Sequence, residues 1–304
     1  MRSTLNPLLR PARLLPAAAC GVALTTTITL QAKHRNMSST TSNNTRAWPT
    51  RSYEPRHATW PYQESDFARE DSNPDTGFYA TSRFVTHIDD AAISSLRDYY
   101  NEVLPRKGKI LDLCSSWISH YPKAIENAAT QGDLKVTGMG MNGSELAANE
   151  VLNHRRIVVD LNEKPDVAAA INGGGGGDDA GGKLDASTMV VSIDYLIKPV
   201  EVLRSLREVT KDQGVVHLTV SNRCFPTKAI ARWLRVSEEE RLQMVGDFLH
   251  FAGWKHIEIV ELSNGKTDNE GGGGSGSAGA LGGIRAFLGA NSRDPLWVVK
   301  GVKE

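Results

Sequence analysis

Cysteine is scarce in this chain. Its 304 residues include only Cys20, Cys114 and Cys224, and no two of them form a CxxC pair. This scarcity argues against a disulfide framework and against a structural zinc site, and it favours a reducing compartment. Net charge is also lacking, because 35 Lys and Arg residues balance 35 Asp and Glu residues. We therefore expect no bound metal and no nucleic-acid partner.

Acidic residues are absent from the amino-terminal segment, where the first carboxylate is Glu54 although arginines occur from Arg2 onward. An acid-free leader with Arg, Ser and Thr is typical of an import presequence, so we assign residues 1–36 to targeting to a mitochondrion or plastid. Two alternatives stay open. Residues 14–32 are apolar enough for a weak membrane anchor, and translation from Met37 would leave a cytoplasmic protein.

The rest of the chain divides by composition. Residues 37–76 are rich in Ser, Thr, Asn and Pro with scattered aromatics, which indicates an extended or disordered arm that docks onto the domain formed by residues 77–304. Two glycine-rich tracts interrupt the domain at 172–182 and 265–283. Homopolymeric glycine does not fix a loop geometry, so we interpret both tracts as surface loop insertions rather than phosphate-binding loops.

Apolar runs alternate with helix-periodic segments throughout the domain. We predict strands at 109–113, 135–141, 156–161, 189–196, 214–220, 255–262 and 296–302. We predict helices at 88–103, 121–130, 144–152, 198–211, 227–234 and 237–251. The alternation indicates a parallel sheet, whereas the last two strands have no helix between them and should pair antiparallel. The predicted fold is a Rossmann-like, doubly wound α/β sheet of seven strands, mostly parallel with an antiparallel final strand.

The first strand of this series, within GKILDLCSSWISHYP (108–122), ends in Asp112 followed by small residues. Ligands bind at the carboxyl ends of strands in such sheets, so this turn indicates a site. Glycine is lacking from the turn. Cys114, Ser115 and Ser116 stand where a nucleotide-binding turn places residues of unusual φ.

The second strand carries a competing fingerprint. In VTGMGMNGSELAAN, Gly138, Gly140 and Gly143 have GxGxxG spacing, and Asp160 follows at the end of the next strand. Alone, this pattern is typical of a dinucleotide-binding turn with Asp160 on a ribose hydroxyl. A NAD(P)-dependent oxidoreductase is therefore one open alternative, although a complete strand unit precedes the motif.

The ordered set of strand ends resembles another family. FYATSRFVTHID, ILDLCSSWISHYP, VTGMGMN, VVDLN, VVSIDYLIKP, SNRCF and DPLWVVKG together resemble class I S-adenosylmethionine-dependent methyltransferases, most closely the divergent type 11 methyltransferase-like group of plants, fungi and algae. The resemblance runs from about residue 77 to residue 303, and sheets of this class end in an antiparallel hairpin. It implies S-adenosylmethionine as cofactor and methyl transfer to a small molecule as activity.

The resemblance implies a set of cofactor-binding residues: Asp112, Cys114, Ser115, Ser116, Gly138, Gly140, Asn142, Asp160, Leu161, Asn162 and Ser192. Two departures from the class pattern stand out. Cys114, Ser116 and Ile118 replace the usual glycines. Gly140 replaces the carboxylate that holds the ribose, which leaves Asn142 as the nearest polar substitute.

Catalytic residues are harder to predict, because methyl transfer mainly requires orientation of the nucleophile and exclusion of water. Asp194 and Tyr195 are candidates for positioning the nucleophile, with a structural role as the equal alternative. Candidates for substrate contacts are Tyr79, His87, Trp117, His120, Asn222 and Arg223. A non-catalytic binding protein that kept the fold without the glycines is the third open interpretation.

Overall fold

The computed structural model describes residues 48–173, 183–265 and 293–304. The predicted presequence and nearly all of both glycine-rich tracts lie outside these described residues. Among the helices of the described ranges, none combines the length and the apolar character that crossing a membrane requires.

Eight strands form a single sheet: β1 (Thr50–Ser52), β2 (Gly108–Leu113), β3 (Leu134–Gly140), β4 (Arg155–Val158), β5 (Leu184–Val190), β6 (Thr210–Ser221), β7 (Lys255–Ser263) and β8 (Leu296–Val302). Their order in the sheet is β1-β7-β8-β6-β5-β2-β3-β4. Strands β2 to β6 pair in parallel, whereas β8 is antiparallel to both of its neighbours, β6 and β7. This confirms the predicted antiparallel final strand.

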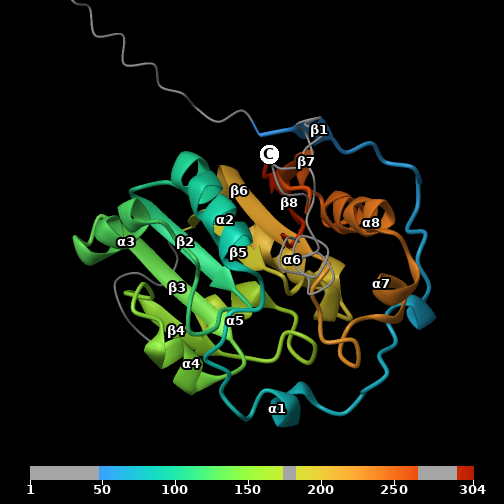
Figure 1. The fold of residues 1–304 in the computed structure, drawn as a ribbon, viewed down its shortest axis with the longest axis horizontal. Helices are drawn as coiled ribbons and strands as arrows, with labels where there is room; N and C mark the ends of the chain where they lie inside the picture. Colours follow the sequence, from blue (N-terminus) through green and yellow to red (C-terminus); the bar gives the residue numbers. More distant parts are fainter. Residues whose placement is uncertain (1–47, 174–182, 266–292) are drawn as a thin grey trace, which may run out of the picture. The chain divides into compact units, whose positions relative to one another are not determined.

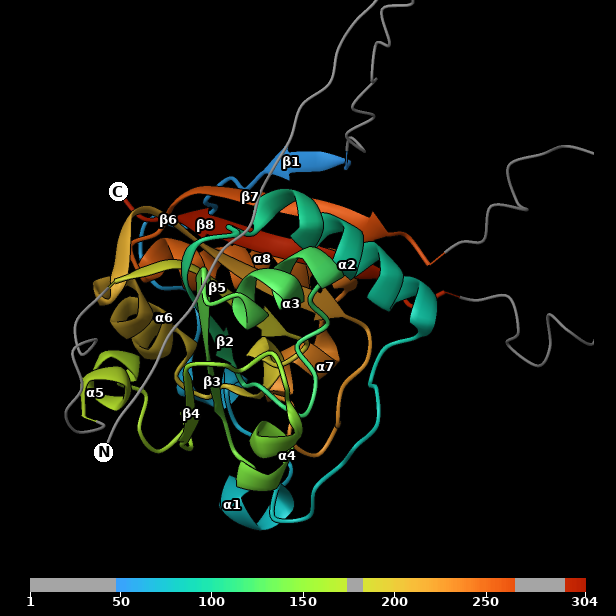
Figure 2. The same ribbon diagram turned by 90° about the vertical axis from the view of Figure 1, so that its left-hand side faces the viewer.

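Helices cover both faces of the sheet (Figures 1 and 2). One face packs against α2 (Asp90–Val103), α3 (Lys123–Thr130) and α4 (Gly143–Ala148). The other packs against α5 (Val167–Asn172), α6 (Pro199–Glu208), α7 (Ala231–Arg235) and α8 (Glu238–Phe251). Strand β2 shows why both faces are covered, since Ile110 joins the first apolar cluster while Leu111 and Leu113 join the second. Apolar side chains on both sides of a strand require two layers of helices.

The strand order places a switch point between β2 and β5. From β2 the chain runs outward through β3 and β4, then returns to β5 and continues through β6 on the other side. Helices on opposite faces leave a crevice at the carboxyl ends of the two central strands, which is where open α/β sheets bind ligands.

Two predictions about strands are corrected. The sheet has eight strands rather than seven, because β1 in the amino-terminal arm pairs antiparallel with β7. The strand predicted at 189–196 is instead β5 at 184–190. The apolar run after it bends because Val191 adopts a φ of 40°, and a 3-10 turn follows at Ile193–Tyr195. Ser187 and Thr188 obscured the true strand in the sequence, yet both are fully buried.

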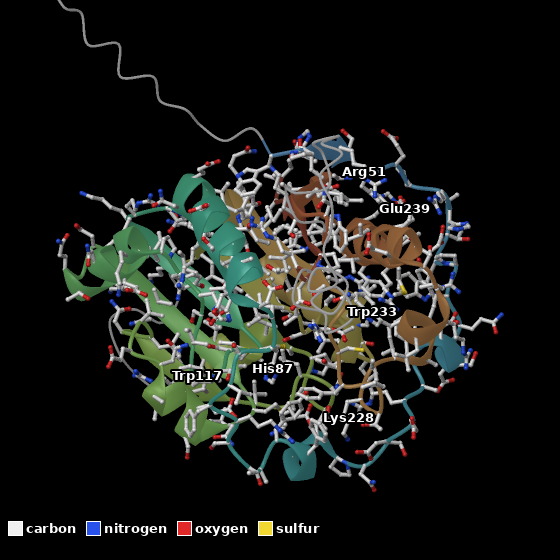
Figure 3. The ribbon with its side chains drawn as sticks, in the orientation of Figure 1. Arg51, His87, Trp117, Lys228, Trp233 and Glu239 are labelled. Carbon is white, nitrogen blue, oxygen red and sulfur yellow. The ribbon has the colours of Figure 1, made fainter. Side chains whose placement is uncertain are left out.

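Residues 48–89 pack along the rest of the domain, and from here on the arm means these residues rather than the 37–76 expected from composition. Arg51 donates to both carboxylate oxygens of Glu239 on α8, at 2.7 and 2.5 Å (Figure 3). The hydroxyls of Tyr53 and Tyr62 both donate to the buried carboxylate of Asp247. These bonds fix the first half of the arm against α8, from where it continues to the carboxyl ends of the strands.

Candidate functional site

A cavity of about 290 Å³ opens at the carboxyl ends of the central strands. All site residues predicted from the sequence line this cavity except Gly138, Gly143, Asp194 and Asn222. The walls come from the turns after β2, β3, β4, β5 and β6 together with residues 75–88 of the arm.

The turn after β2 keeps the backbone conformation that glycine ordinarily supplies. Cys114 has a φ of 51°, in the left-handed region where residues other than glycine are uncommon. Ser115 N donates to Met139 O on β3 at 2.8 Å. Within the described residues, the next three N–H groups, of Ser116, Trp117 and Ile118, donate to no protein acceptor. The turn thus presents free backbone donors despite its lack of glycine.

Asp112 is held beneath this turn by hydroxyl groups. Its Oδ2 accepts from Ser115 Oγ and Ser119 Oγ, both at 2.6 Å, and its Oδ1 accepts from Thr188 Oγ1 at 3.1 Å. Burial raises the pKa of Asp112 to about 6, while the three hydroxyl bonds act in the opposite direction. The carboxylate therefore anchors β2, β5 and the turn to one another at the floor of the cavity.

The GxGxxG glycines have packing roles. Gly138 and Gly140 lie inside β3 rather than in a turn. A Cβ at Gly138 would come within 2.3 Å of Leu152 Cδ1, and a Cβ at Gly140 within 2.1 Å of Ser115 O. These glycines let Leu152, in the segment after α4, and the turn after β2 approach β3 closely. The motif also lies one strand away from the switch point, so the geometry does not support a pyrophosphate turn.

Both polar atoms of the Asn142 side chain are engaged within the protein. Its Oδ1 accepts from Ser82 Oγ (3.1 Å), Ser144 N (2.9 Å) and Glu145 N (3.1 Å), which caps α4. Its Nδ2 donates to Tyr79 O at 2.9 Å. Although Asn142 lines the cavity, its side chain joins α4 to the arm and does not replace the missing ribose carboxylate.

Asn162 is similarly engaged in the protein. Its Nδ2 donates to Asp75 Oδ2 and to Tyr195 O, both at 2.9 Å, and its Oδ1 accepts from Ile197 N at 2.8 Å. The side chain thereby connects the turn after β4 to the arm and to the segment after β5. Asp160, two residues earlier, lines the cavity, and within the described residues its side chain accepts one hydrogen bond, from Asn162 N at 2.9 Å.

Asp194 does not line the cavity, which favours its predicted structural role over the predicted positioning of the nucleophile. The 3-10 turn after Val191 buries its carboxyl, which is 2% exposed, and within the described residues Oδ2 has no hydrogen-bond partner. Desolvation raises the pKa of Asp194 to about 8. Tyr195 does line the cavity, and its hydroxyl oxygen accepts from Phe225 N at 2.9 Å.

The two predicted histidines differ in their surroundings. His120 is 7% exposed, has a φ of 55° and lines the cavity, and its Nδ1 finds no partner among the described residues. Burial lowers the pKa of His120 to about 4. His87 (labelled in Figure 3) is exposed and lines the cavity. Its ring packs edge-on against Phe225 at a centroid distance of 5.3 Å. The His120 imidazole is thus neutral at neutral pH, and in the described part of the chain its Nδ1 is a buried atom without a hydrogen-bond partner.

The remaining predicted residues are at the rim. Trp117 Nε1 donates to Val85 O at 3.1 Å, which closes the turn after β2 against the arm. Arg223 pairs through Nε with Asp294 Oδ1 at 2.7 Å. Asn222 is exposed and does not line the cavity, which corrects its predicted role.

Three charged wall residues were missed by the sequence analysis: Asp75, Arg83 and Glu145. Asp75 is 4% exposed. Burial would raise its pKa, but hydrogen bonds from Arg69, Asn162 and Lys228 lower it. Glu145 accepts Arg83 N at 2.6 Å and Ser116 Oγ at 2.7 Å. Asp75 and Arg83 belong to the arm, and no local pattern in the sequence predicts that the arm passes over the cavity. The one available signal is that Arg83 lies within the FYATSRF segment.

No protein-family model and no curated protein matches the chain. Among solved structures, the chain is similar in fold to phosphoethanolamine N-methyltransferase 2 of Haemonchus contortus in complex with S-adenosyl-L-methionine, at 14% identity and a TM-score of 0.41 over 69% of this chain and 52% of that one. It is similar to TehB from Haemophilus influenzae at 16% identity and a TM-score of 0.38, over 75% and 65%. It is also similar to the cyclase SpnF at 15% identity and a TM-score of 0.43, over 73% and 88%. The chain spans about half the length of the phosphoethanolamine enzyme. Likeness this low assigns no activity, and the fold class rests on the strand order.

Proposed function

We propose that this protein is an S-adenosylmethionine-dependent methyltransferase that acts on a small molecule. The observation that carries the proposal is the position of the cavity at the switch point between β2 and β5, in a sheet that inserts antiparallel β8 between β6 and β7. The ordered strand-end motifs in the sequence resemble the same class. The packing roles of Gly138 and Gly140 argue against the alternative built on a dinucleotide turn.

The charges of the walls suit a cationic ligand. S-adenosylmethionine supplies a methyl group carried on a positively charged sulfur. Four carboxylates line the cavity, those of Asp75, Asp112, Glu145 and Asp160, against two arginines. Asp75 is paired with Arg69 and Lys228, whereas no described residue forms a salt bridge with the other three. A cavity whose unpaired charge is largely negative attracts a positive ligand.

The chain also offers groups for the polar parts of the cofactor. The free N–H groups of Ser116, Trp117 and Ile118 form a set of backbone donors of the kind that binds an anion, here the cofactor's carboxylate. Asp160 and Glu145 would accept hydrogen bonds from its hydroxyl or amino groups. Glu145 takes this role in place of the saturated Asn142.

The remaining wall residues orient the reactants and exclude water. Trp117 and Tyr79 both line the cavity, and the Trp117 indole is fixed by its bond to Val85 O. His120 lines the cavity, and its imidazole stays neutral at neutral pH because burial lowers the pKa of His120 to about 4. A neutral imidazole keeps one unprotonated nitrogen, so His120 is a candidate acceptor for a hydroxyl or amino proton of a ligand.

Calorimetric titration with S-adenosylhomocysteine, compared with NADH, tests the proposal. We expect the wild type to bind S-adenosylhomocysteine and not NADH. Asp160→Asn should weaken binding about ten-fold, because a charge-assisted hydrogen bond is replaced by a neutral one. Glu163→Gln is the matched control, since Glu163 is exposed and outside the cavity wall. Absence of binding by the wild type would support the non-catalytic interpretation instead, and selective NADH binding would support the oxidoreductase.

A further inference from the structure

Arg83 stands apart among the charged residues of the cavity. The other arginine in the wall, Arg223, forms a salt bridge with Asp294. Within the described ranges no carboxylate forms a salt bridge with Arg83, and its guanidinium makes one hydrogen bond, from Nη2 to Phe78 O at 3.1 Å. Arginine carries five N–H donors. Most of the donor capacity of Arg83 is therefore available to a ligand.

Aromatic rings hold the Arg83 guanidinium in place. Its Cζ lies 4.5 Å from the ring centroid of Phe78 and 5.6 Å from that of Phe225. The backbone N–H of Arg83 donates to Glu145 Oε1 at 2.6 Å, which fixes the base of the side chain. Cation–π contacts use the faces of the guanidinium and leave its edge for hydrogen bonds. A fixed planar fork with an open edge is the geometry that binds carboxylate or phosphate through two parallel bonds.

The mouth next to Arg83 is apolar. Phe84 is 54% exposed and Val85 is 55% exposed, the largest fractions among the big apolar side chains of the described arm. The Phe84 ring lies edge-on to Trp117 at 6.3 Å. Both Val85 and Trp117 line the cavity. Exposed apolar side chains gathered around a cavity mouth indicate a ligand with an apolar body.

We propose that Arg83 binds the carboxylate or phosphate of an aromatic methyl acceptor whose ring packs against the lip formed by Phe84, Val85 and Trp117. This inference rests on the proposed function. Two ligands are candidates to supply the anion that Arg83 binds: the methyl acceptor, and the cofactor through its carboxylate. We assign the anion to the acceptor, because the free N–H groups after β2 already provide a separate receptor for the carboxylate of the cofactor.

Calorimetry on the full-length protein separates these sources. With S-adenosylhomocysteine saturating, we expect benzoate and phenyl phosphate to bind the wild type, and Arg83→Gln to weaken both by about ten-fold or more through loss of charge-assisted bonds. Benzyl alcohol, which lacks the anion, should respond little to the substitution. Arg51→Gln is the control, because Arg51 is half-exposed in β1 and outside the cavity wall.

A second titration series locates the anion. The affinities of S-adenosylhomocysteine and of 5′-methylthioadenosine, which lacks the amino-acid group, should be equal in wild type and Arg83→Gln. If Arg83→Gln weakens only S-adenosylhomocysteine, Arg83 binds the cofactor's carboxylate and the proposal is overturned. It is also overturned if benzoate and phenyl phosphate bind neither protein, or both equally. If S-adenosylhomocysteine fails to bind the wild type, the proposed function fails separately, and the anion titrations repeated without it still test Arg83.

A labelling experiment on the wild type keeps the proposal testable if Arg83→Gln does not fold. Phenylglyoxal modifies accessible arginines, and mass spectrometry reads each site. We expect benzoate to protect Arg83 and to leave the labelling of Arg51 unchanged. Equal labelling of Arg83 with and without benzoate would contradict the proposal.

Discussion

Gly140→Ala tests whether the glycines of β3 serve packing or phosphate binding. A Cβ at Gly140 would lie 2.1 Å from Ser115 O, a separation that real contacts do not reach. The turn after β2 must therefore move by roughly 1 Å or more, which strains the bond from Ser115 N to Met139 O. Overpacking costs about 1–3 kcal/mol and a weakened hydrogen bond about 1 kcal/mol. We expect the free energy of unfolding to fall by about 2–4 kcal/mol, which lowers Tm by roughly 5–15 °C for a domain of this size.

Gly143→Ala is the matched control within the same motif. Its Cβ would meet Val158 Cγ2 at 3.5 Å, an ordinary contact, and Gly143 begins α4 without a positive φ. Alanine should be neutral or stabilising there by up to about 1 kcal/mol. Thermal unfolding measures both variants, and S-adenosylhomocysteine titration should show weakened binding for Gly140→Ala alone. Equal destabilisation by both substitutions, or a neutral Gly140→Ala, would refute the packing argument.

Two further predictions concern buried charges. The pKa of Asp194 is about 8 in the folded protein against an ordinary 3.8, so the native state binds more protons than the unfolded state between these values and stability falls as pH rises through this window. Asp194→Asn should therefore be more stable than the wild type by on the order of 5 kcal/mol above pH 8, and about equally stable near pH 4. Urea unfolding across this pH range measures the difference. A difference in stability that does not depend on pH would contradict this prediction. Lys228 is fully buried and pairs with Asp71 at 3.0 Å and Asp75 at 3.1 Å. Lys228→Met should therefore lower the free energy of unfolding by about 3–5 kcal/mol and make residues 69–79 sensitive to protease. Lys211→Met, which removes a half-exposed pair, is its control, and comparable losses for the two variants would contradict the role of burial.

Patterns within a few neighbouring residues were sufficient to predict most strands of the sheet. Strand β2 with Asp112 at its end, the glycine-poor turn that follows, and the antiparallel β8 were all predicted, because apolar periodicity and the order of strands along the chain are properties of the sequence itself. The position of β5 was missed. Ser187 and Thr188 broke its apolar pattern, and only the packed sheet shows that β5 is nevertheless a fully buried central strand, in which Thr188 Oγ1 donates to Asp112.

The sequence by itself determined which segments form the crevice. Each parallel strand is followed directly in the chain by the polar residues of its turn, so a local pattern marks both. The tertiary structure decided which side chains are available there. Asn142 appeared free in the sequence, but Ser82 and the backbone of Tyr79, which are 60 and 63 residues away, hold its side chain. Asp194 is turned into the core, and Arg83 is brought to the cavity by the path of the arm. Hydrogen-bond saturation and side-chain direction depend on such distant contacts, and therefore a local motif cannot specify them.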